Sequence, residues 1–562
     1  MSADAVAEKP SPVEAIKENS RNLRGTIAAD LTTDSDHFGE AEKTLIKFHG
    51  FYQQDDRDAR KDRNRAGGGK AYNFMVRCKI PGGRVSADQY LAVDRLADLY
   101  ANGTLRVTSR QGFQFHGVLK SDLKATLRAI NDCLLTTLGA CGDVSRNVMA
   151  PAAPFANAIY REMQRQADLV AAHLAPRTGA YHEIWLNGEA LPTGANEPEG
   201  IEPIYGKVYL PRKFKAAFAT PDDNSTDIYA QDLSFVADVK DGEIVGYDLY
   251  AGGGMGMTHG NALTFPFLAQ AICYVQPDQV VAAAEATIKL FRDHGNRSDR
   301  KRARLKYVLA AWGIDKFRET FRSYLPFALV LPKNMPIKEF PLHLGWNAQG
   351  DGRFFYGIHV QNGRIKDADG FRLRSALRMI VERFRPEVRL TPMQDVILAH
   401  LPADARPTIE AILAEHGVAL PGVLPMIQQH SMACPAIPTC GLALAEAERA
   451  LPGLVQHLST EIDKLGLSSE KIGIRMTGCP NGCVRPYQSD IGIVGRSGDK
   501  YTLFVGGNLI GSRLSFVLKD LVPYAEIVPT LTHVLTQYRD GRTVGESFSD
   551  YCCRTLTPAA AH

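Results

Sequence analysis

The fold of this chain is decided by two stretches near its C-terminal end, Met432-Ala-Cys-Pro-Ala-Ile-Pro-Thr-Cys440 and Thr477-Gly-Cys-Pro-Asn-Gly-Cys483. Cys434 and Cys440 are spaced as C-x5-C, Cys479 and Cys483 are spaced as C-x3-C, and a longer segment separates the two pairs. In an iron–sulfur cube each iron takes one thiolate from the protein, so four cysteines on short turns can surround it. Backbone amides of such turns can also donate hydrogen bonds to the cluster sulfurs. The pattern therefore favours a 4Fe–4S cluster.

Two other uses of four cysteines remain open at this point. Structural zinc sites also take four thiolates, but they usually space each pair by about two to four residues, which C-x5-C does not match. Disulfide frameworks are typical of small secreted domains, whereas this chain has 562 residues and only ten cysteines. Spacing alone ranks a cluster above zinc and above structural thiols.

The overall composition describes a multidomain protein of a reducing compartment. The length predicts about two to four domains, and few cysteines for that length suit reducing conditions. The N-terminal residues lack the basic and apolar regions of a secretory signal, and no run of about 18 apolar residues occurs. A formal net charge of +3 gives no reason to expect a nucleic-acid or membrane partner. We therefore expect a cytoplasmic protein.

An internal repeat relates the two halves of the chain. Arg106, Thr108 and Gln111 match Arg389, Thr391 and Gln394 at one constant offset along the sequence. Upstream of each match the pattern predicts a helix, over residues 88–100 in the first copy and 370–384 in the second. Asp232-Leu-Ser-Phe-Val is likewise echoed by Asp490-Ile-Gly-Ile-Val. Repeats of this length predict a duplicated α+β module with pseudo-two-fold symmetry and a cofactor cleft between the halves.

The residues around the cysteines resemble the motif of a known family. The segment Arg475-Met-Thr-Gly-Cys-Pro-Asn-Gly-Cys-Val-Arg-Pro486, with the upstream Cys434/Cys440 pair, resembles the sirohaem and 4Fe–4S motif of assimilatory sulfite and nitrite reductases. The resemblance covers about residues 20–552. It implies ferredoxin-like half-modules, three domains around a central sirohaem cleft, and a 4Fe–4S cluster on Cys434, Cys440, Cys479 and Cys483. It also implies that Cys483 is the axial ligand that bridges the cluster to the sirohaem iron.

The repeat and the resemblance together predict the domain boundaries. Residues 1–70 form an N-terminal arm expected to pack on its own protein, with a solvated basic loop over residues 58–70. Residues 71–139 and 336–417 form a composite ferredoxin-like domain. Residues 140–335 bind sirohaem and anion, and residues 418–562 hold the 4Fe–4S cluster and also bind sirohaem.

The sirohaem pocket is predicted on the first repeat. Sirohaem carries eight carboxylates, and arginine can bind a carboxylate through two parallel hydrogen bonds. The segment from Leu105 to His116 alternates polar and apolar residues, which predicts one strand. By resemblance, Arg106, Thr108, Arg110 and Gln114 on this strand line the sirohaem. The residues alone equally fit a solvated strand face. His116 fits either the pocket wall or a hydrogen-bonded core histidine.

The resemblance also implies four basic residues over the distal face of the iron: Arg77, Arg146, Lys213 and Lys215. Four cations in a closed cavity would attract a small dianion such as sulfite. Lysines crowded by other cations should have lowered pKa values, which makes them better proton donors. The alternative for Arg212-Lys213-Phe214-Lys215 is surface charge on a solvated edge strand.

The resemblance implies the six-electron reduction of sulfite to sulfide. Ala251-Gly-Gly-Gly-Met-Gly256 lacks the spacing of a dinucleotide fingerprint, so electrons should come from another protein. Segments 23–31 and 293–301 resemble the haemoprotein subunit of NADPH-dependent sulfite reductases, whose partner is a flavoprotein. Segments 138–143 and 483–487 resemble ferredoxin-dependent enzymes instead. Nitrite reduction and a non-enzymatic zinc- or cluster-binding module are the remaining alternatives.

Overall fold

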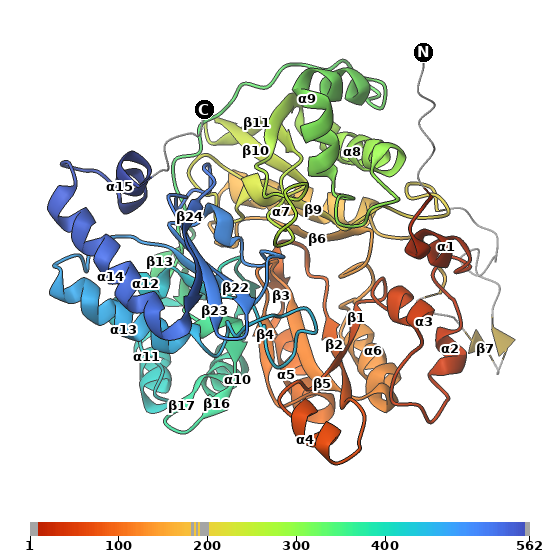
Figure 1. Ribbon diagram of the computed structural model, residues 1–562, viewed down its shortest axis with the longest axis horizontal. Helices are drawn as coiled ribbons and strands as arrows, with labels where there is room; N and C mark the ends of the chain where they lie inside the picture. Colours follow the sequence, from red (N-terminus) through yellow and green to blue (C-terminus); the bar gives the residue numbers. More distant parts are fainter. Residues whose placement is uncertain (1–8, 181–184, 187–188, 191–201, 557–562) are drawn as a thin grey trace.

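The computed structural model describes residues 9–180, 185–186, 189–190 and 202–556 of a mixed α/β protein (Figure 1). Its framework among these residues is four five-stranded sheets. The start of the predicted arm and residues 181–184, 187–188 and 191–201 of the predicted middle domain lie outside the described residues. No helix in the described part of the chain is long and apolar enough to cross a membrane.

Two of the sheets exchange one short strand each. The first sheet contains, in order, β1 (Phe51–Asp55), β2 (Tyr72–Arg77), β5 (Phe113–Val118), β4 (Leu105–Val107) and β15 (Arg364–Ile365). The second contains β13 (Gly345–Ala348), β14 (Phe354–Ile358), β19 (Val396–Leu401), β18 (Glu387–Leu390) and β3 (Arg84–Val85). Strand β15 of the second repeat pairs antiparallel with β4, and β3 of the first repeat pairs antiparallel with β18. This reciprocal exchange is what pseudo-two-fold symmetry predicts. The first sheet begins at residue 51, earlier than the predicted boundary at 71.

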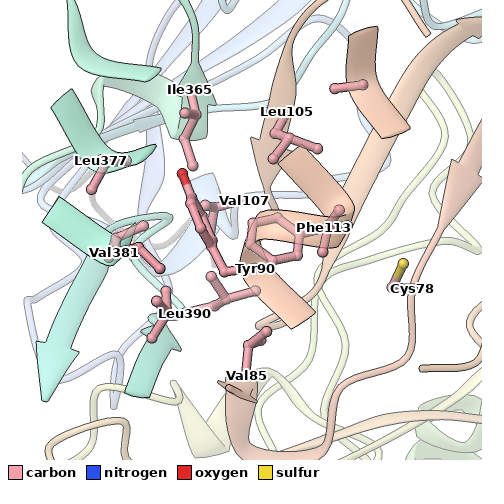
Figure 2. Packing of buried hydrophobic residues seen from close by; sticks show 14 of the residues in the cluster. Cys78, Val85, Tyr90, Leu105, Val107, Phe113, Ile365, Leu377, Val381 and Leu390 are labelled. Carbon is pink, nitrogen blue, oxygen red and sulfur yellow. The ribbon is translucent and has the colours of Figure 1, made fainter. Parts of the chain in front are cut away.

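One apolar core joins the two repeats. Helix α5 (Ala87–Tyr100) begins at a capping box in which Ser86 and Gln89 satisfy each other's backbone N–H groups. Helix α10 (Leu373–Phe384) packs against it, so both predicted helices are confirmed, the second starting a little later than predicted. In Figure 2 the ring of Tyr90 lies between side chains of the first repeat and those of the second, among them Leu377.

The other two sheets share one topology. They contain β6 (Ser145–Met149), β9 (Phe214–Ala219), β10 (Leu233–Lys240), β11 (Glu243–Ala251) and β12 (Gln270–Val275), and β20 (Ser431–Ala433), β21 (Ile474–Thr477), β22 (Ile491–Ser497), β23 (Lys500–Val505) and β24 (Phe516–Pro523). In each sheet the first two pairings are parallel and the last two antiparallel. Helix α7 (Ala158–His173) follows β6, as α13 (Leu451–Lys464) follows β20. Helices α13 and α14 (Tyr524–Gly541) lie side by side on the outside of the second sheet (Figure 1). The predicted duplication is confirmed.

The N-terminal arm packs on the rest of the chain, as predicted. Helix α1 (Pro12–Glu18) buries Lys17 completely, and its Nζ donates to the carbonyl of Leu210 at 2.8 Å. Leu23 is also fully buried. Residues 58–70 were predicted as a solvated loop; they contain a short helix, α4 (Arg60–Arg65), with largely exposed neighbours.

Candidate functional site

The four predicted cluster cysteines follow two neighbouring strands. Cys434 comes directly after β20, and Cys479 and Cys483 follow β21. Because β20 and β21 are paired in parallel, their carboxyl ends lie at the same edge of the sheet. Cys440 returns to this edge on a loop that Arg57 holds, with Nη1 donating to the carbonyls of Cys440 and Ala443 at 3.2 and 2.5 Å. The topology therefore brings both pairs together.

The thiols influence one another. Burial raises the pKa of Cys434 and Cys440, and it raises that of Cys479 to about 12; the nearby Cys483 thiol adds to each shift. The backbone N–H of Gly478 donates to Cys434 Sγ at 3.4 Å, and Asn481 Nδ2 donates to Cys479 Sγ at 3.5 Å. Buried thiols with N–H donors suit sulfur ligation of iron. Among the described residues, no group of three His, Cys, Asp or Glu side chains is arranged to hold a single metal ion.

Two lysines lie close to Cys483. Burial lowers the pKa of Lys213 well below its usual value, and Arg212, Arg304 and Arg146 lower it further. Burial likewise lowers the pKa of Lys215, followed by Arg110, Arg304 and Lys213. The Cys483 thiol, in contrast, raises the pKa of both lysines. Two lysines of the first half thus lie near a cysteine thiol of the second half.

Strand β9 contains Lys215 and is directly preceded by Lys213. It lies between β6 and β10 rather than at the edge of its sheet, so the alternative of a solvated edge strand is wrong. The backbone N–H of Lys215 donates to Asp232 Oδ2 at 3.0 Å, and Arg304 binds both oxygens of Asp232 at 2.8 and 2.9 Å. Both lysine side chains keep partial solvent access.

Arg77 and Arg146 contact a tyrosine and a cysteine that the sequence did not single out. Arg77 Nη1 donates to Cys141 Sγ at 3.0 Å, and its guanidinium lies 5.9 Å from the ring centroid of Tyr52. Burial lowers the pKa of Arg146, but the nearby Tyr52 and Cys141 side chains raise it overall, and Arg146 Nη2 donates to the carbonyl of Gly142 at 3.1 Å. The positive charge of Arg146 in turn lowers the pKa of Lys213. The four predicted anion-binding residues therefore belong to one connected group.

The prediction of a single strand from Leu105 to His116 is wrong. The chain forms a hairpin of β4 and β5, and the N–H of Thr108 donates to the carbonyl of Gly112 at 2.9 Å. An added Cβ at Gly112 would lie 2.7 Å from the carbonyl oxygen of Cys78, so only glycine fits this turn. Arg110 therefore lies on the turn, whereas Arg106 and Gln114 face each other across the hairpin, Nη1 to Oε1 3.2 Å.

Arg106 lies next to the cluster cysteines. Its Nε donates to Glu448 at 3.0 Å and its Nη2 to the carbonyl of Ala433 at 2.9 Å, directly before Cys434. Glu448 also pairs with Arg364 of the exchanged strand β15 at 2.7 Å. Because all members are largely buried, removing one would leave a buried charge without its partner.

His116 and Arg110 offer buried polar atoms without partners. Both ring nitrogens of His116 are buried and lack a hydrogen bond in the described structure, so it is not a hydrogen-bonded core histidine. Burial, followed by Arg364, Arg106 and Arg77, lowers its pKa. Arg110 Nε is also buried and unpaired, although its other nitrogens donate to Gln231 and to backbone carbonyls. Such atoms are what a polar bound group would satisfy.

The comparisons with known proteins agree with this geometry. Residues 166–329 and 429–547 match the model of the nitrite and sulphite reductase 4Fe–4S domain. Residues 67–133 and 347–416 match that of the nitrite/sulfite reductase ferredoxin-like half domain. The chain belongs to the nitrite and sulphite reductase family. The family predicted from the cysteine motif is therefore confirmed, with two copies of each domain.

Members of this family resemble the chain along nearly its whole length. The sulfite reductase [NADPH] hemoprotein beta-component of Staphylococcus saprophyticus is 43% identical, over 98% of this chain and 96% of that protein. The sulfite reductase [ferredoxin] of Synechococcus elongatus is 42% identical, over 99% and 91%. The structure of the Mycobacterium tuberculosis NirA protein has the same fold, with a TM-score of 0.79, 23% identity and 97% of each chain covered.

Proposed function

We propose that this chain is the haemoprotein component of an assimilatory sulfite reductase and reduces sulfite to sulfide by six electrons. The observation that carries the proposal is the convergence of four cysteines with Lys213 and Lys215 at Cys483. A thiolate ligand of an electron store next to a cluster of cations is what reduction of a small anion needs. The names of the relatives support sulfite as that anion.

The chain's own residues fit the two cofactors of the family. Cys434, Cys440, Cys479 and Cys483 would hold a 4Fe–4S cluster, and Cys483 would also contribute its thiolate to the sirohaem site. Arg110 and His116 fit the polar rim of a sirohaem because their buried nitrogens lack partners. Arg106, Thr108 and Gln114 stay in the proposed pocket, although Arg106 and Gln114 already bond within the chain. When bound, the two cofactors supply electrons to the substrate one at a time.

The basic residues bind the anion and deliver protons. Arg77, Arg146, Lys213 and Lys215 would neutralise the dianion, and its three oxygens leave as water, which requires protons as well as electrons. A lysine with a lowered pKa gives up its proton more readily near neutral pH. Arg146 would stay charged and orient the anion, because Tyr52 and Cys141 raise its pKa against the effect of burial.

A separate protein delivers the electrons. Strand β11 is followed by the Gly-rich stretch and then by an irregular segment up to β12 at Gln270, which does not favour a nucleotide site there. We propose a flavoprotein reductase as the partner, because most of the similar proteins bear the name of an NADPH-dependent beta-component. Ferredoxin is the alternative donor, from the similarity to the Synechococcus enzyme.

The proposal is tested on protein purified without oxygen. Its absorption spectrum and its iron and labile sulfide content should report one sirohaem and one 4Fe–4S cluster per chain. With a chemically reduced viologen dye as donor, sulfite should yield sulfide faster than nitrite yields ammonia. A chain that binds zinc in place of iron, or that reduces nitrite only, would contradict the proposal.

A further inference from the structure

Two equivalent residues of the two halves contact each other. Lys215 N–H donates to the Asp232 side chain at 3.0 Å, and Gly473 N–H donates to the Asp490 side chain at 2.8 Å. Lys215 is therefore equivalent to Gly473, and Asp232 to Asp490, at one constant offset along the sequence. At the same offset Asp227 is equivalent to Arg485. Both have left-handed backbones, with φ of 53° and 60°, and a short 3₁₀ helix follows each. Equivalent residues in contact must lie near the pseudo-two-fold axis.

One carboxylate serves two buried arginines at this point. Asp227 is fully buried, and its Oδ2 accepts from Arg485 Nε and, at 3.0 Å, from Arg475 Nη1. Its Oδ1 accepts from Gln488 Nε2 at 2.9 Å. Both guanidinium groups are at least nine-tenths buried. The carboxylate of the first half thus balances two cations of the second half in a region where unpaired charge is costly.

The remaining nitrogens of Arg485 reach both copies of the repeat. Nη1 donates to the carbonyl of Ser109 and Nη2 to that of Pro392, each at 3.3 Å. Ser109 and Pro392 are equivalent positions, related by the same offset that relates Arg106 to Arg389. One side chain therefore fixes the two equivalent turns relative to each other, and the first of these turns carries Arg110.

The same contacts hold the turn that carries Cys483. The N–H of Arg485 donates to the carbonyl of Gly482 at 3.0 Å and closes the turn around Cys483. Ser109 Oγ donates to the carbonyl of Cys483 at 3.1 Å. Gly482 has a φ of +60°, and a Cβ there would lie 3.0 Å from the ring of Tyr487. These bonds fix the backbone that carries the Cys483 thiol.

We propose that Asp227 is a positioning residue for the Cys483 thiolate, because it neutralises Arg485 and Arg475 and so keeps the Cys483 turn fixed between the two halves. This inference rests on the proposed function, in which Cys483 would contribute its thiolate to both cofactor sites. Asp227 touches neither cofactor nor substrate in this role. Without its charge, two buried arginines repel each other, and the turn between them loses its anchor.

The test compares Asp227→Asn with a matched control, Asp94→Asn. Asp94 is also buried and also accepts from two arginines, Arg374 Nε at 2.6 Å and Arg378 Nε at 2.5 Å, but it lies in the core between α5 and α10. For each variant, cofactor content, absorption spectrum, reduction potential of the cluster, thermal unfolding and sulfite turnover with reduced viologen are measured.

Both variants should unfold more easily than the wild-type protein. Only Asp227→Asn should also shift the absorption spectrum and the cluster potential and lower turnover by about tenfold to a hundredfold, the scale of a misplaced reacting group. A wild-type spectrum, potential and turnover in Asp227→Asn would overturn the inference. If that variant does not fold, Asp227→Asn with Arg475→Gln, which removes one of the unpaired cations, decides by the same criteria. Failure of the wild-type protein to reduce sulfite would instead refute the proposed function.

Discussion

Replacing Lys215 by methionine separates its chemical role from its structural one. Lys215 is the second residue of β9, and the cations Arg110, Arg304 and Lys213 surround it. Methionine has a similar length and no charge, so it fills the space without a proton to give. The substitution therefore removes one of the proposed proton donors and also relieves repulsion among like charges.

The effect on stability follows from the direction of the pKa shift. The pKa of Lys215 is lower in the folded chain than in the unfolded one, so between these two values the unfolded chain binds more protons. Stability therefore rises with pH across this window, because the charged form of Lys215 destabilises the fold. We expect Lys215→Met to be at least as stable as the wild-type protein, with a gain on the order of 1 kcal/mol.

The effect on turnover should be far larger. A lost general acid typically costs a factor of about 10² or more, which corresponds to roughly 2.7 kcal/mol of barrier. Cofactor content should not change, because the backbone bond from Lys215 to Asp232 does not involve the side chain. In the wild-type protein, turnover should fall as pH rises through the lowered lysine pKa values, and this limb should flatten in the variant.

The assay is steady-state sulfite reduction with reduced viologen over a pH series, with a thermal unfolding curve of the same sample. Lys471→Met is the matched control, since Lys471 is the exposed equivalent of Lys213 in the second half. The control should keep full turnover. Unchanged turnover in Lys215→Met, or a loss that merely follows unfolding, would refute the role of Lys215.

Three further outcomes are expected. Cys483→Ser should lose the coupled spectrum and nearly all sulfite reduction; a wild-type spectrum with wild-type turnover would remove the bridging role. Arg110→Ala should lower sirohaem content while cluster iron stays bound, which pyridine haemochrome-type spectra and iron analysis distinguish; equal loss of both would indicate a general folding defect. The purified chain should not oxidise NADPH unless a flavoprotein reductase is added, and direct oxidation by the chain alone would contradict a separate donor.

The sequence predicted best those features that depend on a few neighbouring residues. The two cysteine pairs lie on turns after parallel strands, so their local pattern was sufficient to predict the cluster. The duplication could be predicted because Arg106 and Arg389 stand in two sequence segments that match each other. The exchange of β3 and β15 could not, because strands of two residues carry no periodic signal.

The predictions failed where a residue's role depends on distant partners. Alternation from Leu105 to His116 suggested one strand, but Gly112 closes a turn against the backbone of Cys78, which lies on a separate stretch of the sequence. Tyr52 and Cys141 join Arg77 and Arg146 only through the fold. Tyr52 stands in no recognisable motif, and segment 138–143, which contains Cys141, does not indicate a contact with either arginine. Glu448 was missed for the same reason, although an acidic residue close to the cysteines was a possible signal.

The exchanged strands have a consequence for the chain as it leaves the ribosome. Val85 of β3 pairs with Val388, so the whole segment between these two residues must be made before this pairing can form. At about 5–20 residues per second, synthesis of that segment takes roughly 15–60 seconds. During this time the first repeat exposes apolar side chains that later pack against α10, and its strand β4 lacks its neighbour β15. Nascent chains are therefore prone to aggregation until the second repeat has been synthesised. Cleavage of the chain between the repeats would leave each half with an unpaired strand at the edge of its sheet.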